Sequence, residues 1–275
     1  MPGSTIPDFN IRINGANLPP EARSDIRAVT VHEDLDALSM FTVELFNWRT
    51  EGQNQRSTWA DAALFGIGNE VEIWLGYVDD LQKVMLAEIT SLEATYSTGD
   101  EEEDVLIVRG YDHRHRLTRG RKTRTFTQIK DSAIASQVAT GAGLRAQVKD
   151  SKVSLPYVVQ SNQTDWEFLQ SRAARIGYEV FVREKVLYFR PPQNTSQATL
   201  RLELDTHISE FTPRLSSLAQ VGEVTVRGWD VKQKQVIVGK AGAGQEASLM
   251  GGRSSGPRTA NRAFGKPASP ASANP

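Results

Sequence analysis

Two of the four histidines stand close enough together to suggest a metal site or a catalytic pair. His113 and His115 are two residues apart, so on a strand both would point to one face, a spacing that metal ligands use. A site needs a third ligand, however, and the neighbouring arginines repel a cation. Asp112 precedes His113, but no G-x-S-x-G elbow or other nucleophile motif accompanies the pair. Metal binding and acid–base catalysis therefore have little support.

Other chemistry is also poorly represented. The absence of cysteine excludes thiolate catalysis, disulfide bonds and cysteine metal ligands. No Walker sequence is present, and the glycine-rich run at 239–244 precedes no capped helix that would hold a phosphate. The acidic run at 100–103 follows a glycine at a predicted hairpin tip, where adjacent carboxylates form a solvated loop. The sequence therefore predicts no enzymatic activity, no metal and no cofactor.

The densest charge lies between Arg109 and Arg124, where six arginines and one lysine face a single acid, Asp112. This basic segment has three interpretations: a solvated surface, a phosphate-binding site for nucleic acid, or a protein interface. A net charge of −1 and few interleaved aromatic residues argue against nucleic acid. Arginine suits an interface because its planar group pairs with carboxylates in a bidentate way. The candidate interface residues are Arg109, Tyr111, Arg114, Arg116, Arg119, Arg121, Lys122 and Arg124.

Short strands must position this segment. Apolar and polar residues alternate with period two, which is typical of half-buried antiparallel strands. We predict strands over 9–13, 26–31, 41–48 and 71–77, and a long hairpin over 83–96 and 104–111. A short helix is predicted over 57–65, with Ser57 as its N-cap and Gly66 as its end.

The period becomes helical after Asp131, which is placed to cap a helix ending at Gly141. A second helix follows Thr164, because Thr164 and Glu167 form a capping-box pattern. A hairpin is predicted over 178–190, and further strands over 199–204, 208–215, 221–229 and 231–238. The remainder, 241–275, is rich in Gly, Ala, Ser and Pro, which predicts a linker or tail.

The start of the basic segment returns later in the chain. Val108-Arg109-Gly110-Tyr111-Asp112 is echoed 118 positions on by V-R-G-W-D at 226–230. Two unrelated hairpins of similar composition would explain this, and so would a duplicated β-unit. Duplication predicts two similar barrels, since closing a sheet removes its exposed edges. The predicted parts are a first barrel with one short helix over 1–127, a helix pair, hairpin and second barrel over 128–240, and a tail over 241–275.

Composition fits an ordinary soluble protein. Of 275 residues, 39% are hydrophobic and 24% charged. The N-terminus lacks a signal-peptide pattern, and no apolar run approaches the roughly 20 residues that span a bilayer. We therefore expect assembly in the cytoplasm and no membrane partner.

Two motifs in order suggest a family. The first combines Glu88-Ile89-Thr90-Ser91-Leu92-Glu93, V-R-G-Y-D at 108–112 and H-R-L-T-R-G-R at 115–121; the second combines S-N-Q-T-D-W-E-F-L at 161–169 and R-I-G-Y-E-V at 175–180. Together they resemble the late control protein D or VgrG-type hub of contractile phage tails, type VI secretion systems and extracellular injection particles.

The resemblance implies a mainly β protein with a few helices, built as two tube-like antiparallel barrels and pseudo-sixfold when trimeric. It implies a homotrimeric, non-enzymatic baseplate hub, which joins the inner tube or tube-initiator protein to a spike or needle-tip protein beside baseplate wedge proteins. A needle domain would then be a separate chain or lie beyond residue 275. The particle would be released or act outside the cell. Two alternatives from other classes remain: a particle-associated hydrolase on a barrel scaffold, and a nucleic-acid-binding β-protein.

Overall fold

The computed structural model describes residues 6–51, 54–57, 59–60, 63–96, 104–193, 200–214, 216, 220–231, 233–245, 254–265 and 271–273. The chain divides into two compact units, Met1–Pro192 and Gln193–Pro275. The predicted boundary at 127/128 falls within the first unit, inside a strand. The predicted domain limits thus stay predictions.

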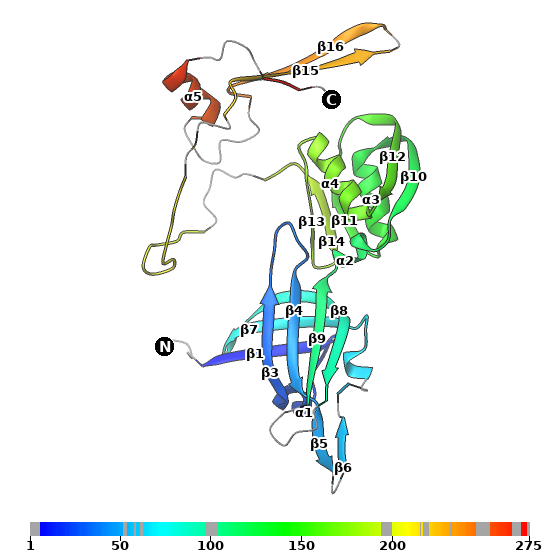
Figure 1. Ribbon diagram of the computed structural model, residues 1–275, viewed down its shortest axis with the longest axis vertical. Coiled ribbons are helices and arrows are strands. Elements are labelled where there is room, and N and C mark those ends of the chain that lie inside the picture. The colour runs from blue at the N-terminus through cyan, green and yellow to red at the C-terminus, as the bar shows by residue number, and fades with distance from the viewer. Residues whose placement is uncertain are drawn as a thin grey trace. The chain divides into compact units, whose positions relative to one another are not determined.

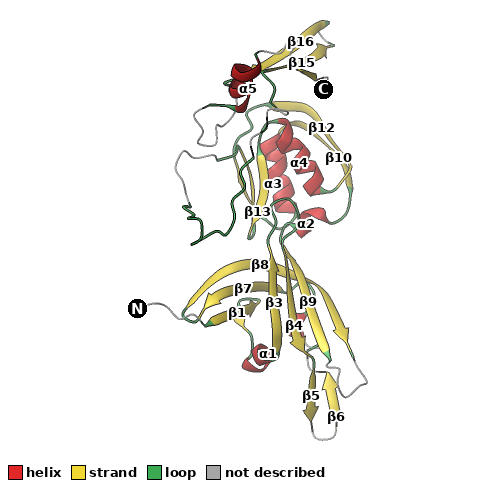
Figure 2. Ribbon diagram, turned by 60° about the vertical axis from the view of Figure 1, so that its left-hand side comes forward, coloured by secondary structure: helices red, strands yellow, loops and turns green. Residues whose placement is uncertain are grey.

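A seven-stranded sheet forms the N-terminal part of the first unit, and all its neighbours pair antiparallel. The strands, in the order in which they lie, are β2 (Ala16–Asn17), β1 (Pro7–Ile13), β7 (Glu70–Tyr77), β8 (Asp80–Thr95), β9 (Val105–Asp112), β4 (Met40–Phe46) and β3 (Ile26–His32). The sheet is curved (Figures 1 and 2). No ladder within the described part of the chain joins β2 to β3, so closure into a barrel stays a proposal.

The sheet buries the residues that period-two alternation places on one face. In β4, Phe41, Val43 and Leu45 are buried while their neighbours are half-exposed, which confirms the predicted strand. They pack in one core with Ile73 of β7 and Ile89 of β8. A short helix, α1 (Pro20–Ser24), adds Ala22 to this core.

The helix predicted over 57–65 is wrong. Ser57 pairs with Trp48 across the hairpin of β5 (Trp48–Glu51) and β6 (Asn54–Ser57), so the expected N-cap is part of a strand. Only a single 3₁₀ turn, η1 (Ala63–Phe65), follows, and residues 58, 61 and 62 lie outside the described residues. Pairing within a β-hairpin overrides the local capping signal here. The acidic run at 100–103 also lies outside the described residues.

The rest of the first unit combines two small sheets with helices. Its elements are α2 (His115–Thr118), β10 (Lys122–Lys130), α3 (Asp131–Gly141), β11 (Arg145–Val148), β12 (Ser154–Gln163), α4 (Asp165–Arg175), β13 (Glu179–Arg183) and β14 (Val186–Arg190). Strand β10 pairs antiparallel with β12, and β14 lies between β11 and β13. Ile134 and Val138 of α3 and Leu169 of α4 share a core with Leu187 and Phe189 of β14. The predicted hairpin over 178–190 is confirmed.

The starts of the two longer helices differ from each other. The N-cap of α3 is Lys130, without a side-chain cap, so the expected capping role of Asp131 is wrong. Asp131 is buried and binds Arg172 of α4 instead, with Arg172 Nε 2.5 Å from Asp131 Oδ1. At α4 the capping box is confirmed: Thr164 Oγ1 accepts from Glu167 N at 3.1 Å, and Glu167 Oε2 accepts from Thr164 N at 3.0 Å.

Replacing Thr164 by alanine removes this cap and is expected to lower the free energy of unfolding by about 1 kcal/mol. Urea denaturation followed by circular dichroism measures the change. Thr140→Ala is the matched control, because Thr140 lies in α3, is exposed and donates only to the Ser136 carbonyl. Equal losses in the two variants would contradict the capping role.

The described residues of the second unit form a three-stranded sheet and one helix. Strand β15 (Glu223–Asp230) lies between β16 (Gln235–Gly242) and β17 (Ala271–Ala273). The strands predicted over 199–204 and 208–215 are wrong where the structure describes them, since 200–214 contains only the bridge Leu204↔Ile208. Leu200 in this stretch is 71% exposed. An alternating apolar pattern stabilises a strand only when a neighbouring strand pairs with it and the apolar side chains are buried. A second barrel stays a proposal.

Helix α5 (Gly256–Phe264) forms inside the stretch predicted to be a tail. Ser255 is its N-cap and accepts from Arg258 N at 3.4 Å, and a proline follows in the first turn. Both are helix-start signals that a composition argument overlooks.

The repeated motif occupies the same place in two strands. It forms the last five residues of β9 and the last five of β15, each an eight-residue strand. In both copies the aspartate closes the next turn: Asp112 Oδ1 accepts from Arg114 N at 2.9 Å, and Asp230 Oδ1 from Gln233 N at 3.0 Å. The two glycines differ, because a Cβ on Gly110 would lie 2.1 Å from Glu88 O, whereas a Cβ on Gly228 would lie 4.0 Å from Ile237 Cβ.

Candidate functional site

The basic segment passes from β9 through α2 into β10, and so links the curved sheet to the helical part of the first unit. His113 lies in the turn after β9 and His115 begins α2, so the assumption that both lie on one strand is wrong. Among the described residues, no group of three or more His, Cys, Asp or Glu side chains can hold a metal ion.

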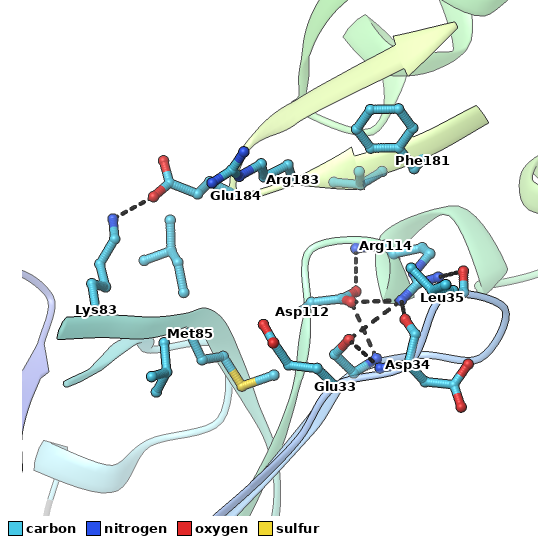
Figure 3. A pocket seen from close by; sticks show the side chains of 14 residues that line it. Glu33, Asp34, Leu35, Lys83, Met85, Asp112, Arg114, Phe181, Arg183 and Glu184 are labelled. Atoms are coloured by element: carbon cyan, nitrogen blue, oxygen red, sulfur yellow. Dashed lines mark hydrogen bonds and ion pairs between the residues drawn. The ribbon is translucent and has the colours of Figure 1, made fainter. Parts of the chain in front are cut away.

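Arg114 is buried within the chain, and it holds a loop that is about 80 positions away in the sequence. Its Nη1 donates to the Leu35 carbonyl and its Nη2 to the Asp34 carbonyl, both at 3.1 Å. Nη2 also lies 3.0 Å from Asp112 Oδ2, and the guanidinium sits 5.4 Å from the centre of the Trp166 ring. Figure 3 shows the contacts of Arg114 with Asp34, Leu35 and Asp112. The charge of Arg114 is therefore neutralised by its own chain.

Glu88, on β8, is the buried centre of a second cluster. Arg116 Nε donates to Glu88 Oε2 at 2.8 Å, Arg116 Nη2 contacts Glu88 Oε1, and His115 Nε2 lies 2.7 Å from Glu88 Oε2. Burial alone would raise the pKa of Glu88, but hydrogen bonds from Arg116 and His115 outweigh it and hold that pKa at about 2. The same hydrogen bond to Glu88 raises the pKa of Arg116.

His113 is buried beside this cluster, and neither of its ring nitrogens has a hydrogen-bond partner. Its Nε2 lies 3.5 Å from Glu70 Oε2, and Glu70 also forms an ion pair with Lys185 from the β13–β14 turn. Burial lowers the pKa of His113, so its ring is neutral at neutral pH. These contacts join β7, β8 and the β13–β14 hairpin across the two parts of the first unit.

A third cluster neutralises the end of the basic segment. Asp165, in the first turn of α4, accepts from Lys122 Nζ at 2.6 Å and from Arg124 Nη2 at 2.7 Å. Glu167 pairs with Arg121 at 2.8 Å. Both carboxylates also lie where the dipole of α4 favours negative charge.

The three remaining candidate residues differ in exposure. Arg109 pairs with Glu93 on the neighbouring strand β8. Tyr111 is half-buried and lies between Met40 and Glu88 in the sheet register. Arg119 is exposed and has no ion pair with any described residue. Pairing with carboxylates was predicted, and the partners observed belong to the same chain; an interface with another chain stays a prediction.

Sequence reasoning missed the acidic half of these clusters. Glu88 belongs to one of the motifs that suggested a family, but nothing in the sequence points to its pairing with residues 27 and 28 positions later. Asp165 carries a weak signal, since an acid in the first turn of a helix is common.

A groove of about 670 Å³ lies beside Arg114, between the curved sheet and the β13–β14 hairpin (Figure 3). Its apolar lining comes from β8, β13 and Leu35 of the β3–β4 loop, with Met85 and Phe181 among the residues, and the Asp112–Arg114 pair lies on one wall. Lys83 of β8 forms an ion pair with Glu184 of the hairpin, at another side. The charged pairs satisfy one another, so this groove offers contact surface rather than a poised nucleophile. No described helix is long and apolar enough to cross a membrane.

Comparison with solved structures defines the class of fold. A 43 kDa tail protein of prophage MuSo2 from Shewanella oneidensis superposes with a TM-score of 0.60 at 15% identity, over 88% of this chain and 70% of that one. A tail protein from Neisseria meningitidis MC58 gives 0.54 at 15% identity, over 86% and 68%. A Francisella PdpA–VgrG complex gives 0.50 at 11% identity, over 90% of this chain and 43% of that one. The chain shares the fold of phage tail and VgrG-type proteins.

By sequence, the chain belongs to the family described as the Alg8 N-terminal domain, which matches residues 4–260. No match was found among curated proteins. The expected resemblance to tail and spike proteins is thus supported at the level of the fold, and a mainly β protein with a few helices is confirmed.

Proposed function

We propose that this chain is the structural hub of a contractile injection particle, a symmetry adapter between a hexameric inner tube and a trimeric spike. The observation that carries the proposal is the fold, which phage tail proteins share over 86–88% of this chain. The Francisella complex contains a VgrG protein, and 90% of this chain aligns with the matched chain. A shared fold supports the proposal by analogy, and the local chemistry adds to it.

The arrangement of charge supports a structural role. Within the described part of the first unit, the basic segment is held by Glu88, Asp165 and Glu167 in ion pairs that connect separate elements. Such pairs hold separate elements in one arrangement. An enzyme would instead need unpaired titratable groups that converge on a substrate.

The symmetry argument rests on the repeated motif. A homotrimer of chains with two similar β-units presents six similar units to a sixfold tube and three chains to a threefold spike. The matching places of the motif in β9 and β15 agree with such a duplication. The partners in this proposal are the tube or tube-initiator protein, the spike or needle-tip protein and the baseplate wedge proteins. Assembly takes place in the cytoplasm, before the particle is released or acts outside the cell.

Native mass spectrometry of the purified chain tests the oligomeric state. We expect a species of three times the chain mass of 30.4 kDa. Cryo-electron microscopy of particles from the producing cell provides the second readout, with three copies expected between tube and spike. Particles that lack the chain, or that contain it in another copy number, would contradict the proposal.

A further inference from the structure

The loop between β3 and β4 presents an unusual combination of charge and apolar surface. Residues Glu33–Ala37, here called the acidic loop, are all exposed, and Leu35 is 93% exposed. Leu35 is flanked by the carboxylates of Glu33, Asp34 and Asp36. None of the three forms an ion pair with any residue that the structure describes.

The acidic loop has a defined conformation. Asp34 Oδ1 accepts from the backbone N–H groups of Asp36 and Ala37, both at 2.7 Å, and Ser39 Oγ accepts from Asp34 N at 3.2 Å. The two backbone hydrogen bonds lower the pKa of Asp34, so its carboxylate is ionised at neutral pH. Arg114 donates to the carbonyls of Asp34 and Leu35 (Figure 3). The loop is therefore held on both sides of Leu35.

Holding the loop in this way is costly. A buried guanidinium loses its hydration, and Arg114 Nε has no hydrogen-bond partner. A single exposed leucine on a mobile loop needs no explanation. Here, however, a buried cation fixes the backbone so that Leu35 points outward. A loop whose backbone is already ordered loses little backbone entropy on binding, so such a loop is suited to recognition.

We propose that the acidic loop docks onto a second copy of this chain, with Leu35 in an apolar contact and the carboxylates on a neighbouring cation. The cation is Arg119, the member of the basic segment that is exposed and has no ion pair with any residue in the described ranges. Its charge complements the three acids. Two different patches on one chain form a head-to-tail contact, which closes into a ring in a cyclic trimer. The inference rests on the proposed trimer and names the surface that forms it.

Sedimentation equilibrium of the full chain tests the contact. Leu35→Asp is expected to raise the dissociation constant of the trimer by at least about thirtyfold, as loss of a central apolar contact does. Ile67→Asp is the matched control, because Ile67 is also exposed (71%) and lies on another turn of the same unit. Both variants are expected to fold, because neither side chain contributes to the core. Circular dichroism checks this.

A charge exchange tests the partner residue. Asp36→Arg should weaken the trimer, and adding Arg119→Asp should restore it; rising ionic strength should weaken the wild type. A Leu35→Asp trimer as tight as that of the wild type would overturn the docking role and leave the hub function untouched. Failure of Arg119→Asp to restore the Asp36→Arg trimer would overturn the assignment of Arg119. A wild-type chain that stays monomeric at every concentration would overturn the contact and count against the trimeric hub.

Discussion

Replacing Gly110 by alanine is expected to lower the free energy of unfolding by about 3 kcal/mol, the upper range for overpacking. The added Cβ would lie 2.1 Å from the Glu88 carbonyl oxygen and 2.4 Å from Phe41 Cε1. Strand β9 is hydrogen-bonded to β8 on one side and to β4 on the other. Neither of these strands can move away from the added Cβ without breaking its hydrogen bonds to β9. Thermal unfolding followed by circular dichroism should show a loss of roughly 6–12 °C in Tm.

Two control glycines separate this clash from a general effect of alanine. Gly141 is the last residue of α3, and a Cβ there meets no atom within 4 Å. Gly141→Ala should leave stability unchanged or raise it by about 0.5 kcal/mol, because alanine favours helix. Gly228→Ala, at the second copy of the repeated motif, should also have a mild effect, since the added Cβ would lie 4.0 Å from Ile237 Cβ, an ordinary contact. A Gly110→Ala variant as stable as these two would show that β8 and β9 yield more easily than the packing implies.

Replacing Glu88 by glutamine is expected to cost roughly 3 kcal/mol at neutral pH, because breaking a buried ion pair leaves a charge uncompensated. Arg116 would lose its carboxylate partner, and His115 would lose its ionised acceptor. Glu93→Gln is the control. Glu93 pairs with Arg109 on the exposed side of the same strand, so its loss should stay within about 0.5 kcal/mol. Equal effects in the two variants would contradict a special role for Glu88.

The same cluster predicts a pH dependence. The pKa of Glu88 falls from 4.5 to about 2 on folding, so the folded state binds its proton less tightly than the unfolded state. The stabilisation, roughly 3 kcal/mol, is complete above the unfolded pKa and is lost as the pH falls from 4.5 towards 2. Urea denaturation at several pH values should show this loss in the wild type and a flatter profile in Glu88→Gln. Parallel profiles would rule out Glu88 as the source.

The features that the sequence predicted well depend on neighbouring residues. The alternation of Phe41, Val43 and Leu45 has the period of a strand, and Thr164 and Glu167 form a box within one turn. Local signals fail where strand pairing competes with them or is missing. Ser57 has the chemistry of an N-cap but pairs with Trp48 in a hairpin, and the apolar pattern over 200–214 lacks a neighbouring strand among the described residues.

The basic segment shows the same division most clearly. The sequence alone determined that six arginines and one lysine lie at and after the end of a strand, and that this strand's final motif recurs at 226–230. Only the tertiary structure decided which carboxylates meet them, because Glu88 and Asp165 come from other elements, on either side of the segment. It also decided that Arg114 lies inside the protein and holds an exposed loop some 80 positions away, while Arg119 remains open to solvent. Charge can be counted along a chain, but its neutralisation depends on contacts that form only when distant segments pack together.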